Sequence, residues 1–376
     1  MQNEKVYLVG GAVRDHLLNV ESKDRDYVVV GSSPEKMIAN GFTQVGASFP
    51  VFLHPVTGDE YALARTERKT GTGYHGFDTV YDSSVTLEDD LERRDLTINS
   101  MAMTDNFQII DPFNGIKDLE KGILRHTSDA FADDPLRVLR LARFSARYGF
   151  SVAPETMELS RKLVRSGELN TLPRERIWTE LYKGFSEKDP SLMLEVLNDS
   201  GVLKVVPFFD YFGTSDFDIH TVRGLMELVK VAKTECNKTD AKVMIAMSNL
   251  GRLGTDILTI LTVPNHIRDA IRLEHALTLV LNDMTAESVH KFFNATRFVS
   301  NAESETTKLA MFVSKVRVKT SQEKDRNWNK NLNRLKGAAA AVKKLDMAAV
   351  VANGDMKTVK VRVDAAKFAA IKRKLK

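Results

Sequence analysis

The hydrophobic positions in the first third of the chain come in short runs separated by turn-forming residues. The runs VYLV (6–9), YVVV (27–30), EYALA (60–64) and QIID (108–111) are rich in β-branched and aromatic side chains, and Gly, Pro and Asp stand between them. Runs of this length and composition are typical of strands. The pattern of residues 1–126 therefore predicts an α+β domain.

After residue 126 the hydrophobic positions follow the helical period. Four segments show it, at 134–148, 155–165, 174–186 and 190–200, with breaks at Gly149, Gly167, Pro190 and Gly201. The helical pattern returns from 217 to about 310, with a break at TVPN (262–265), and VANGDMKTV (351–359) supplies a later turn. The expected layout is a mixed α/β head followed by helical domains in series, without internal repeats.

The composition is that of an ordinary water-soluble protein and excludes several classes. Of the 376 residues, 43% are hydrophobic and 28% are charged, and no apolar run approaches the length of a membrane helix. The N-terminus lacks the features of a signal peptide. A single cysteine, Cys236, excludes an internal disulfide framework and a Cys-rich zinc module. We expect a cytoplasmic protein without a membrane association or a stable protein partner.

The net charge of +4 conceals a strong asymmetry. Residues 315–376 contain 18 Lys and Arg against 5 Asp and Glu, a net charge of +13, so the preceding 314 residues carry −9. A basic C-terminal region on an acidic body suggests a polyanionic partner that is bound mainly at one end. A solvated, solubilising tail is the alternative interpretation.

The segment LVGGAVRDHLL (8–18) combines a strand end, a Gly-Gly pair and a helix start near Ala12. Backbone N–H groups at such a junction can approach an anion closely, and Arg14 on the first turn can add a positive charge. A Gly-Gly pair alone is weak evidence for such a site, because most such pairs are merely tight turns.

Asp24 and Asp26 stand one residue apart at the start of the run YVVV. In an extended segment both carboxylates point to the same side, and the repulsion between them must be relieved by a positive charge. Paired carboxylates of this kind hold Mg²⁺ in phosphoryl-transfer sites. The alternative is a surface pair neutralised by Arg25 or Lys23. Glu60 is a candidate third carboxylate, or simply a glutamate of an edge strand.

The segment LEDDLERRDLTINS (87–100) contains a dense polar cluster. Arg94 is a candidate phosphate ligand, and Asp95, which would share a helix face with Asn99 at i,i+4, could orient an arginine. The acids Glu88, Asp89 and Asp90 are those expected at the positive end of a helix dipole.

The segment DDPLRVLRLARFSAR (133–147) predicts a helix that begins with Asp133 or Asp134 as N-cap and Pro135 at the first helical position. One Asp followed by several arginines on a helix face can offer a hydrogen-bonding edge to a base and positive charge to a triphosphate. An ion-paired solvent face is the alternative, which is less favoured because that face contains few acids. The arginines are Arg137, Arg140, Arg143 and Arg147.

These motifs, in this order, resemble the class II tRNA nucleotidyltransferases (CCA-adding enzymes) of the gammaproteobacterial type and their relatives, the bacterial poly(A) polymerases. The resemblance rests on YLVGGAVRD, KDRDYVVVGS, FPVFLHP, EYALARTERK, VTLEDDLERRDLTIN, IIDPFNG and DPLRVLRLARF, and it extends from residue 5 to about 207. It implies a DNA polymerase β-like nucleotidyltransferase head with a mixed sheet, followed by an all-α neck, body and tail. The implied boundaries are 1–133, 134–207, 208–314 and 315–376.

The resemblance also implies a reaction and its residues. CTP, CTP and ATP would be added in turn to the 3′ end of tRNA without a nucleic-acid template, with release of pyrophosphate, and the tail would bind the acceptor and T-stem backbone. Asp24 and Asp26 would hold catalytic Mg²⁺. Asp134 and Arg137 would present a Watson–Crick-like edge to the incoming base. The further nucleotide contacts would be Gly11, Arg14, Arg94, Arg140 and Arg143.

Two further segments match the family. ARTERKTGTGYHG (64–76) resembles its flexible loop, in which Arg65, Glu67 and Arg68 are candidates for the switch from CTP to ATP. LPRERIWTEL resembles the neck motif, in which Glu175, Arg176 and Glu180 would brace the templating helix.

The chain departs from the family pattern at two places. Asp133 stands where the family usually has Glu. Ser248-Asn249 replaces the His-Asp pair of the phosphohydrolase domain, although His220 matches the first histidine of that domain. A lone histidine cannot build a dinuclear metal site, so we expect a degenerate domain without phosphohydrolase activity. Poly(A) addition and an inactive RNA-binding relative remain as alternatives.

Overall fold

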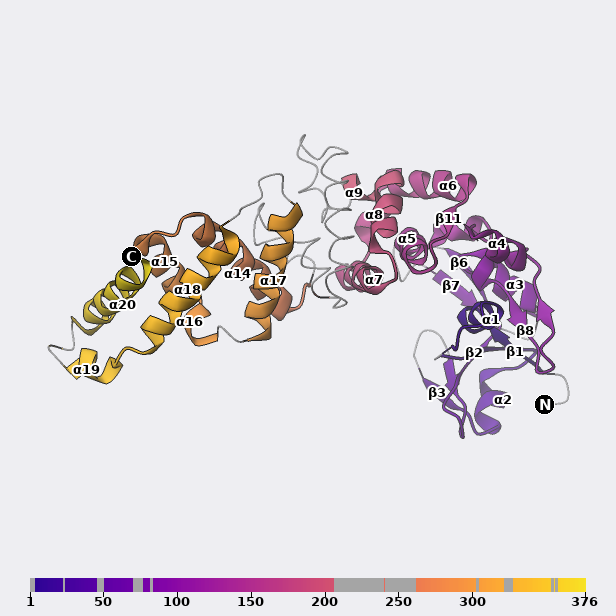
Figure 1. The fold of residues 1–376 in the computed structure, drawn as a ribbon. Coiled ribbons are helices and arrows are strands. Elements are labelled where there is room, and N and C mark those ends of the chain that lie inside the picture. Colours follow the sequence, from indigo (N-terminus) through magenta and orange to yellow (C-terminus); the bar gives the residue numbers. More distant parts are fainter. Residues whose placement is uncertain are drawn as a thin grey trace. The chain divides into compact units, whose positions relative to one another are not determined.

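The computed structural model describes residues 4–22, 24–45, 51–69, 77–81, 84–205, 240, 262–301, 304–320, 327–352, 355 and 358–376 (Figure 1). The chain divides into two compact units, residues 1–213 and 214–376, and each is described by itself. None of the described helices is long and apolar enough to cross a membrane.

The head is built on a mixed sheet that has seven strands among the described residues. The central strands β2 and β5 are parallel, and all other neighbours in this sheet are antiparallel. The predicted strand runs are therefore confirmed. The order across the sheet is β3 (Thr43–Val45), β4 (Val51–Leu53), β5 (Glu60–Leu63), β2 (Asp26–Val30), β1 (Lys5–Val9), β8 (Ala102–Met103) and β9 (Ile109–Ile110).

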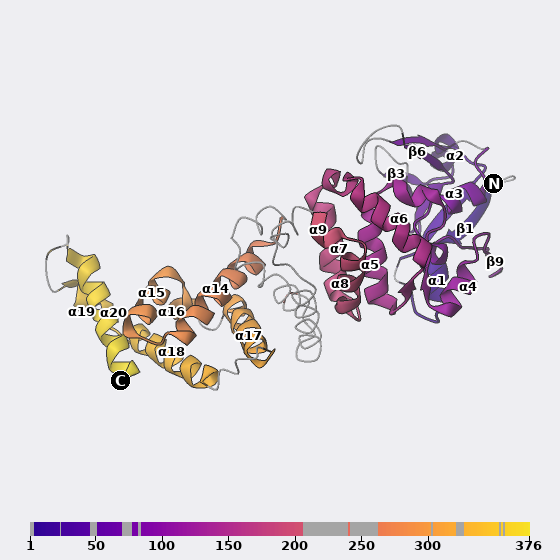
Figure 2. The ribbon, with the colours of Figure 1, turned by 90° about the horizontal axis from the view of Figure 1, so that it is seen from above.

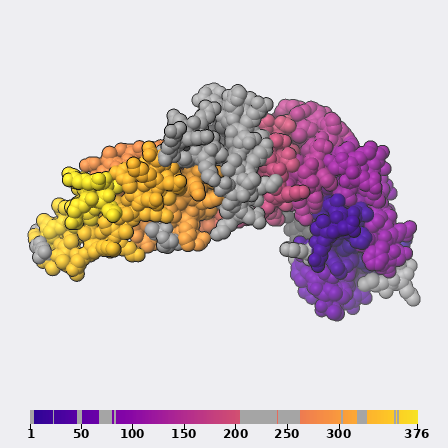
Figure 3. Space-filling model, in the orientation of Figure 1, coloured from indigo at the N-terminus to yellow at the C-terminus, as the bar shows by residue number. Residues whose placement is uncertain are grey.

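The two faces of this sheet are covered by different helices. Val29 packs with Met37 of α2 (Pro34–Ala39), and Val13 of α1 (Gly11–Leu17) packs with Met101 beside β1. Val28, on the opposite face, packs with Leu91 of α3 (Leu87–Glu92). Side chains alternate along a strand, so position 26 shares the face of Val28 and α3. The indigo residues of β1 and α1 also form part of the head surface in the space-filling view (Figure 3).

Shorter elements complete the head. Strands β6 (Thr66–Lys69) and β7 (Phe77–Val80) pair antiparallel, so part of the segment predicted as a flexible loop is a strand, and residues 70–76 lie outside the described residues. Strands β10 (Ile123–Leu124) and β11 (Ser151–Val152) pair in parallel. The remaining elements are η1 (Thr97–Asn99), α4 (Gly115–Lys121) and η2 (Asp129–Asp133).

The neck is helical, as predicted. Its helices are α5 (Leu136–Tyr148), α6 (Pro154–Arg165), α7 (Arg174–Ser186), α8 (Pro190–Asp199) and α9 (Val202–Val205), with the 3₁₀ turn η3 at Glu168–Thr171 (Figure 2). The predicted breaks at Gly149, Gly167 and Gly201 have positive φ angles, which glycine adopts without strain. Helix α5 packs against both α7 and α8.

The described part of the second unit is entirely helical. Its helices are α14 (Asn265–Asn282), α15 (Ala286–Ala295), α16 (Phe298–Asn301), α17 (Glu305–Thr320), α18 (Trp328–Lys343), α19 (Met347–Ala352) and α20 (Val359–Leu375). The break predicted at 262–265 is confirmed, since α14 begins at Asn265. One apolar core includes Leu277 and Phe298 together with Trp328 and Ile371, so helices of the predicted body and tail share it.

Some predictions for the second unit fall where the structure describes nothing. His220 and the pair Ser248-Asn249 lie outside the described residues. The degenerate phosphohydrolase domain therefore stays a prediction. The predicted body–tail boundary at 314/315 falls within α17.

The start of α4 is a point of close packing that generates a stability prediction. A Cβ atom added at Gly115, which is buried, would lie 2.3 Å from the carbonyl oxygen of Thr97 in η1. Backbone atoms cannot yield as a flexible side chain does, so Gly115→Ala is expected to lower the free energy of unfolding of the first unit by roughly 1–3 kcal/mol. Urea unfolding measures this change.

Gly337→Ala is the matched control. Gly337 lies inside α18, where an added Cβ would meet only the flexible end of Lys374, and alanine favours the helix. This variant is expected to be neutral or stabilising. A Gly115→Ala protein as stable as the wild type would contradict the packing described for α4 and η1.

Candidate active site

Two exposed carboxylates mark the start of the central strand. Asp26 is the first residue of β2, and Asp24 precedes it by two positions. Partial desolvation raises the pKa of Asp26; the positive charge of Arg94 opposes this shift, and the negative charge of Asp24 adds to it. Arg94 therefore supplies the positive charge that the sequence predicts for this pair; its effect outweighs the repulsion from Asp24, and the pKa of Asp26 is raised because of desolvation.

The donor set fits a divalent cation of the Mg²⁺ type. Such an ion needs only one or two protein carboxylates, since substrate phosphates and water complete its coordination. Glu60, the candidate third carboxylate, begins β5 and stands in register with Asp26 on the adjacent parallel strand. Within the described ranges, however, no group of three or more His, Cys, Asp or Glu side chains is arranged to hold a metal.

The Gly-Gly turn brings the strand end, α1 and Arg94 together. Gly10 has a φ of +68°, and a Cβ atom there would lie 2.7 Å from Nη1 of Arg94. At Gly11, a Cβ atom would lie 3.3 Å from Nη2 of Arg14. Both glycines therefore let a guanidinium approach the backbone of the turn, and side chains at either position would push these arginines away.

A buried aspartate that sequence reasoning missed holds the two adjacent arginines. Asp90 is fully buried; its Oδ2 accepts from Nη2 of Arg94 (3.0 Å) and its Oδ1 from Nη2 of Arg93 (2.7 Å). The backbone N–H of Arg65, just before β6, also donates to Oδ1 (3.3 Å). Burial alone would raise the pKa of Asp90, but the two arginines hold it below its usual value.

The sequence does contain a signal for this role. Asp90 stands at i,i+3 and i,i+4 from the two arginines, which is the spacing of helix ion pairs. The helix-start interpretation applies instead to its neighbour Asp89, which forms a capping box with Thr86.

Arg14 is buried, with an exposed fraction of 4%. Its Nε and Nη2 donate to Oδ1 of Asp15 (3.0 and 2.8 Å), and its Nη1 donates to Oδ1 of Asn99. The guanidinium carbon lies 5.0 Å from the centroid of the Tyr148 ring. Arg14 therefore lies beneath the Gly-Gly turn and connects α1 to η1 and α5.

Asp95 connects the head to α5. Its Oδ2 accepts from Nε and Nη2 of Arg140, both at 2.8 Å, and its Oδ1 accepts from Nδ2 of Asn99 (2.9 Å). Burial would raise the pKa of this carboxyl, but Arg140 and the bond from Asn99 hold it far below its usual value. Asp95 thus orients an arginine, as the sequence suggests, although residues 95–99 include a 3₁₀ turn rather than an α-helix.

The N-terminus of α5 is anchored from both the head and the neck. One carboxylate oxygen of Asp134 accepts from the N–H of Leu136 (3.0 Å), and the other accepts from Nη2 of Arg176 on α7 (2.9 Å). Arg137 donates to the carbonyl oxygens of Ala130 (2.8 Å) and Arg93 (2.6 Å). The predicted N-cap is wrong by one position: Pro135 is the N-cap and the helix begins at Leu136, although the Asp134 carboxylate still accepts from the first N–H of the helix.

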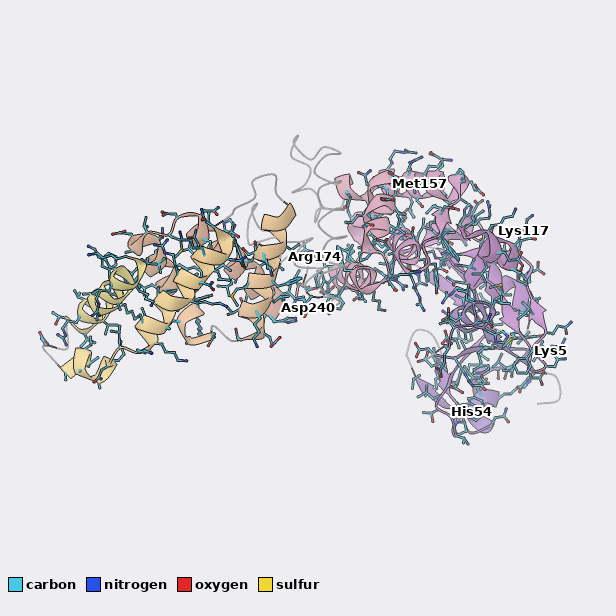
Figure 4. All side chains as sticks on the ribbon, viewed as in Figure 1. Lys5, His54, Lys117, Met157, Arg174 and Asp240 are labelled. Atoms are coloured by element: carbon cyan, nitrogen blue, oxygen red, sulfur yellow. The ribbon has the colours of Figure 1, made fainter. Side chains whose placement is uncertain are left out.

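The arginine face of α5 is ion-paired with acids from other elements. Arg143 donates to Glu180 of α7 (2.6 Å) and lies 3.6 Å from Glu187, while Arg147 lies 3.6 Å from Asp15 of α1. The sequence interpretation underestimated this pairing, because it counted only the acids of the helix itself. Bracing by the neck motif is confirmed for Arg176 and Glu180. Glu175 is exposed near the start of α7, which begins at the labelled Arg174 (Figure 4).

Two cavities flank these elements. One of about 550 Å³ is lined by Arg93 and Ala130, the residues whose carbonyls hold Arg137, together with Thr66 of β6 and Asp129. Another, of about 1010 Å³, includes Tyr27, which alternates with Asp26 along β2 and so points to the opposite face. Neither cavity is lined by Asp24 or Asp26, so neither is assigned to the nucleotide by its lining alone.

Two protein families match the first unit. The family described as "Poly A polymerase head domain" matches residues 6–125. The family described as "Probable RNA and SrmB-binding site of polymerase A" matches residues 149–212.

Curated relatives match at high identity over part of their length. The chain is 61% identical over 205 residues to a multifunctional CCA protein of Vibrio parahaemolyticus, covering 54% of this chain and 50% of the relative. It is 60% identical over 205 residues to a CCA-adding enzyme of Marinobacter nauticus, covering 54% and 55%. The chain thus spans about half the length of the curated relatives it matches.

Solved structures share the fold over nearly the whole chain. A CCA-adding enzyme in apo form II has a TM-score of 0.68 at 23% identity, covering 99% of this chain and 88% of that one. The Thermotoga maritima CCA-adding enzyme complexed with tRNA has a TM-score of 0.66 at 23% identity, covering 99% and 87%. Residues 6–125 and 149–212 thus match two poly(A) polymerase families, about half of the chain is similar to CCA-adding enzymes, and the chain shares the fold of solved CCA-adding enzymes.

Proposed function

We propose that this protein adds C, C and A in turn to the 3′ end of tRNA, using CTP and ATP and releasing pyrophosphate. One observation carries the proposal: the exposed pair Asp24 and Asp26, the Gly-Gly turn and Arg94 come together, and Arg137 of α5 donates to the backbone of the adjacent Arg93. A metal and triphosphate site thus stands next to a helix that carries base-reading groups. The names of the relatives support the same reaction.

The proposed chemistry divides between these groups. Asp24 and Asp26 would hold Mg²⁺, which polarises the α-phosphate and lowers the pKa of the attacking 3′-hydroxyl. Arg94 would contact the phosphates beside the turn at Gly11, where the backbone offers close approach. Arg14 would supply positive charge from beneath that turn.

Nucleotide choice is assigned to α5. Asp134, two residues before α5, offers an acceptor, and Arg137 in the first turn of α5 offers donors, which is the hydrogen-bonding pattern of a base edge. The Asp134 carboxylate is oriented by its bonds to Leu136 and Arg176, and Arg137 by two carbonyls. Arg140 and Arg143 would complete the nucleotide pocket with positive charge, and their carboxylate partners hold the two guanidinium groups in place.

The basic C-terminal region is proposed to bind the tRNA acceptor and T-stem backbone, in the cytoplasm. Sugar–phosphate recognition needs exposed cations rather than base-reading groups. Exposed lysines and one exposed arginine on α18 and α20 and next to them meet this requirement: Lys330, Lys336, Lys343, Lys344, Lys360, Lys372, Arg373, Lys374 and Lys376.

The reaction itself separates CCA addition from poly(A) addition. A transcript of tRNA lacking its 3′ end is incubated with CTP alone, ATP alone and both nucleotides. We expect addition of two C residues with CTP alone, and of C, C and A followed by a stop with both. A long ladder of A residues without C would contradict the proposal and favour a poly(A) polymerase.

The metal assignment is tested by removing each carboxylate. Asp24→Ala and Asp26→Ala are each expected to lower the transfer rate by at least about a thousandfold, because the cation that stabilises the transition-state charge is lost. Binding of tRNA, measured by filter retention, should stay within about twofold of the wild type, since phosphate contacts on the basic region are untouched.

Asp105→Ala is the matched control, because Asp105 is an exposed aspartate of the head on the β8–β9 turn. Its transfer rate should equal that of the wild type. Full activity in both Asp24→Ala and Asp26→Ala would refute the metal site.

A further inference from the structure

Besides the bonds of Arg137 near its start, helix α5 is attached to the head through side chains at two further points along its length. The first is the ion pair between Arg140 and Asp95. The second lies at the other end of the helix, where Tyr148 and Arg147 face Asp15 of α1. Neither Asp15 nor Tyr148 has a role in the chemistry assigned above.

The second attachment is compact and buried. Oδ1 of Asp15 accepts from Arg14 and from the hydroxyl of Tyr148 (3.3 Å), and Oδ2 lies 3.6 Å from Nη2 of Arg147. Asp15 is 6% exposed, so this carboxylate depends on its partners for compensation of its charge. If one of these partners is removed, the buried Asp15 carboxylate loses a hydrogen bond or a compensating charge.

The two attachments belong to one closed ring of interactions. From Tyr148 the ring runs through Asp15, Arg14, Asn99 and Asp95 to Arg140. It returns to its start through the backbone of α5. Each link is a hydrogen bond or ion pair between side chains, so the loss of one link opens the ring.

Two attachments constrain a helix more than one does. Residues 140 and 148 are eight positions apart, about 12 Å along the axis at 1.5 Å per residue. The bonds of Arg137 and Arg140 lie only three positions apart near the start of the helix, whereas the contact of Tyr148 lies far along the axis, so that contact fixes the direction of the helix as well as its position. The direction of α5 determines where Asp134 and Arg137 lie relative to the head.

We propose that Asp15 and Tyr148 are positioning residues that set the tilt of α5, and through it the discrimination between correct and incorrect nucleotides. The part of this inference that concerns nucleotide discrimination rests on the proposed nucleotidyl transfer. Tyr148 lies about 18 Å along the helix axis from Leu136, so it acts through the helix and not by touching the base.

The ionisation state of Tyr148 is consistent with this role. Burial raises the pKa of its phenol to about 12, so the hydroxyl stays protonated at neutral pH and donates to Asp15. Tyr148→Phe removes this one hydrogen bond and keeps the ring against which Arg14 packs. Asp15→Asn keeps the size of the side chain and removes its charge.

The claim that these residues set the position of α5 is tested by amide hydrogen exchange, which requires no enzymatic activity. In Tyr148→Phe and in Asp15→Asn, exchange of residues 136–141 is expected to quicken by about fivefold or more, since one hydrogen bond to a charged group is lost at the far end of the helix. Tyr81→Phe, at an exposed tyrosine of the head, is the control and should change nothing there. Unchanged exchange at 136–141 in both variants would overturn the proposal.

The effect on nucleotide discrimination is tested on the full chain with the tRNA substrate. The ratio of kcat/KM for CTP over UTP is expected to fall about fivefold in Tyr148→Phe, mainly through KM, with kcat for CTP nearly retained. A merely structural role would reduce the amount of active protein and leave this ratio unchanged, which would also overturn the proposal. If the wild-type protein transfers no nucleotide while the two variants still exchange faster at residues 136–141, the proposed function is refuted and the attachment is not.

Discussion

The first unit depends on how one buried carboxylate, that of Asp95, is compensated. A buried charge without partners is costly, so its partners must hold definite positions. Arg140 satisfies one oxygen from α5 and Asn99 satisfies the other from η1, while Asn99 in turn accepts from Arg14 of α1. Helix α1, which follows the Gly-Gly turn, η1 and α5 are therefore joined through groups that cannot separate without leaving a buried charge without its partner.

This constraint separates two tasks within one site. In the proposed reaction, the exposed carboxylates at the end of β2 would hold the cation, and Asp134 and Arg137 at the start of α5 would read the base while Arg176 and backbone carbonyls hold them in place. A nucleic-acid template positions bases by pairing, whereas a protein that replaces it must fix its hydrogen-bonding groups in space. The carboxylates that pair with the arginines of α5 hold these side chains in fixed positions.

Much of the fold follows from local patterns, and much of the site does not. The strand runs and the neck helices are predictable because the hydrophobic period and the glycine breaks, such as Gly149, are local signals in the sequence. The pairing of Asp24 with Asp26 was predictable for the same reason. Asp90 was read as a helix-start acid although it is fully buried, and the partners of Arg143 and Arg147 come from 37 and 132 residues away. Such contacts are set by packing, which one sequence does not reveal.

The interaction between Asp95 and Arg140 tests this account most directly. Asp95→Ala, Arg140→Ala and the double variant form a cycle, with the free energy of unfolding of the first unit measured by urea denaturation. We predict a coupling energy of about 1–3 kcal/mol, because Arg140→Ala leaves the buried Asp95 carboxylate without its charged partner. Single effects that add to within about 0.5 kcal/mol would contradict the account, since the head and α5 would then be held together by other contacts.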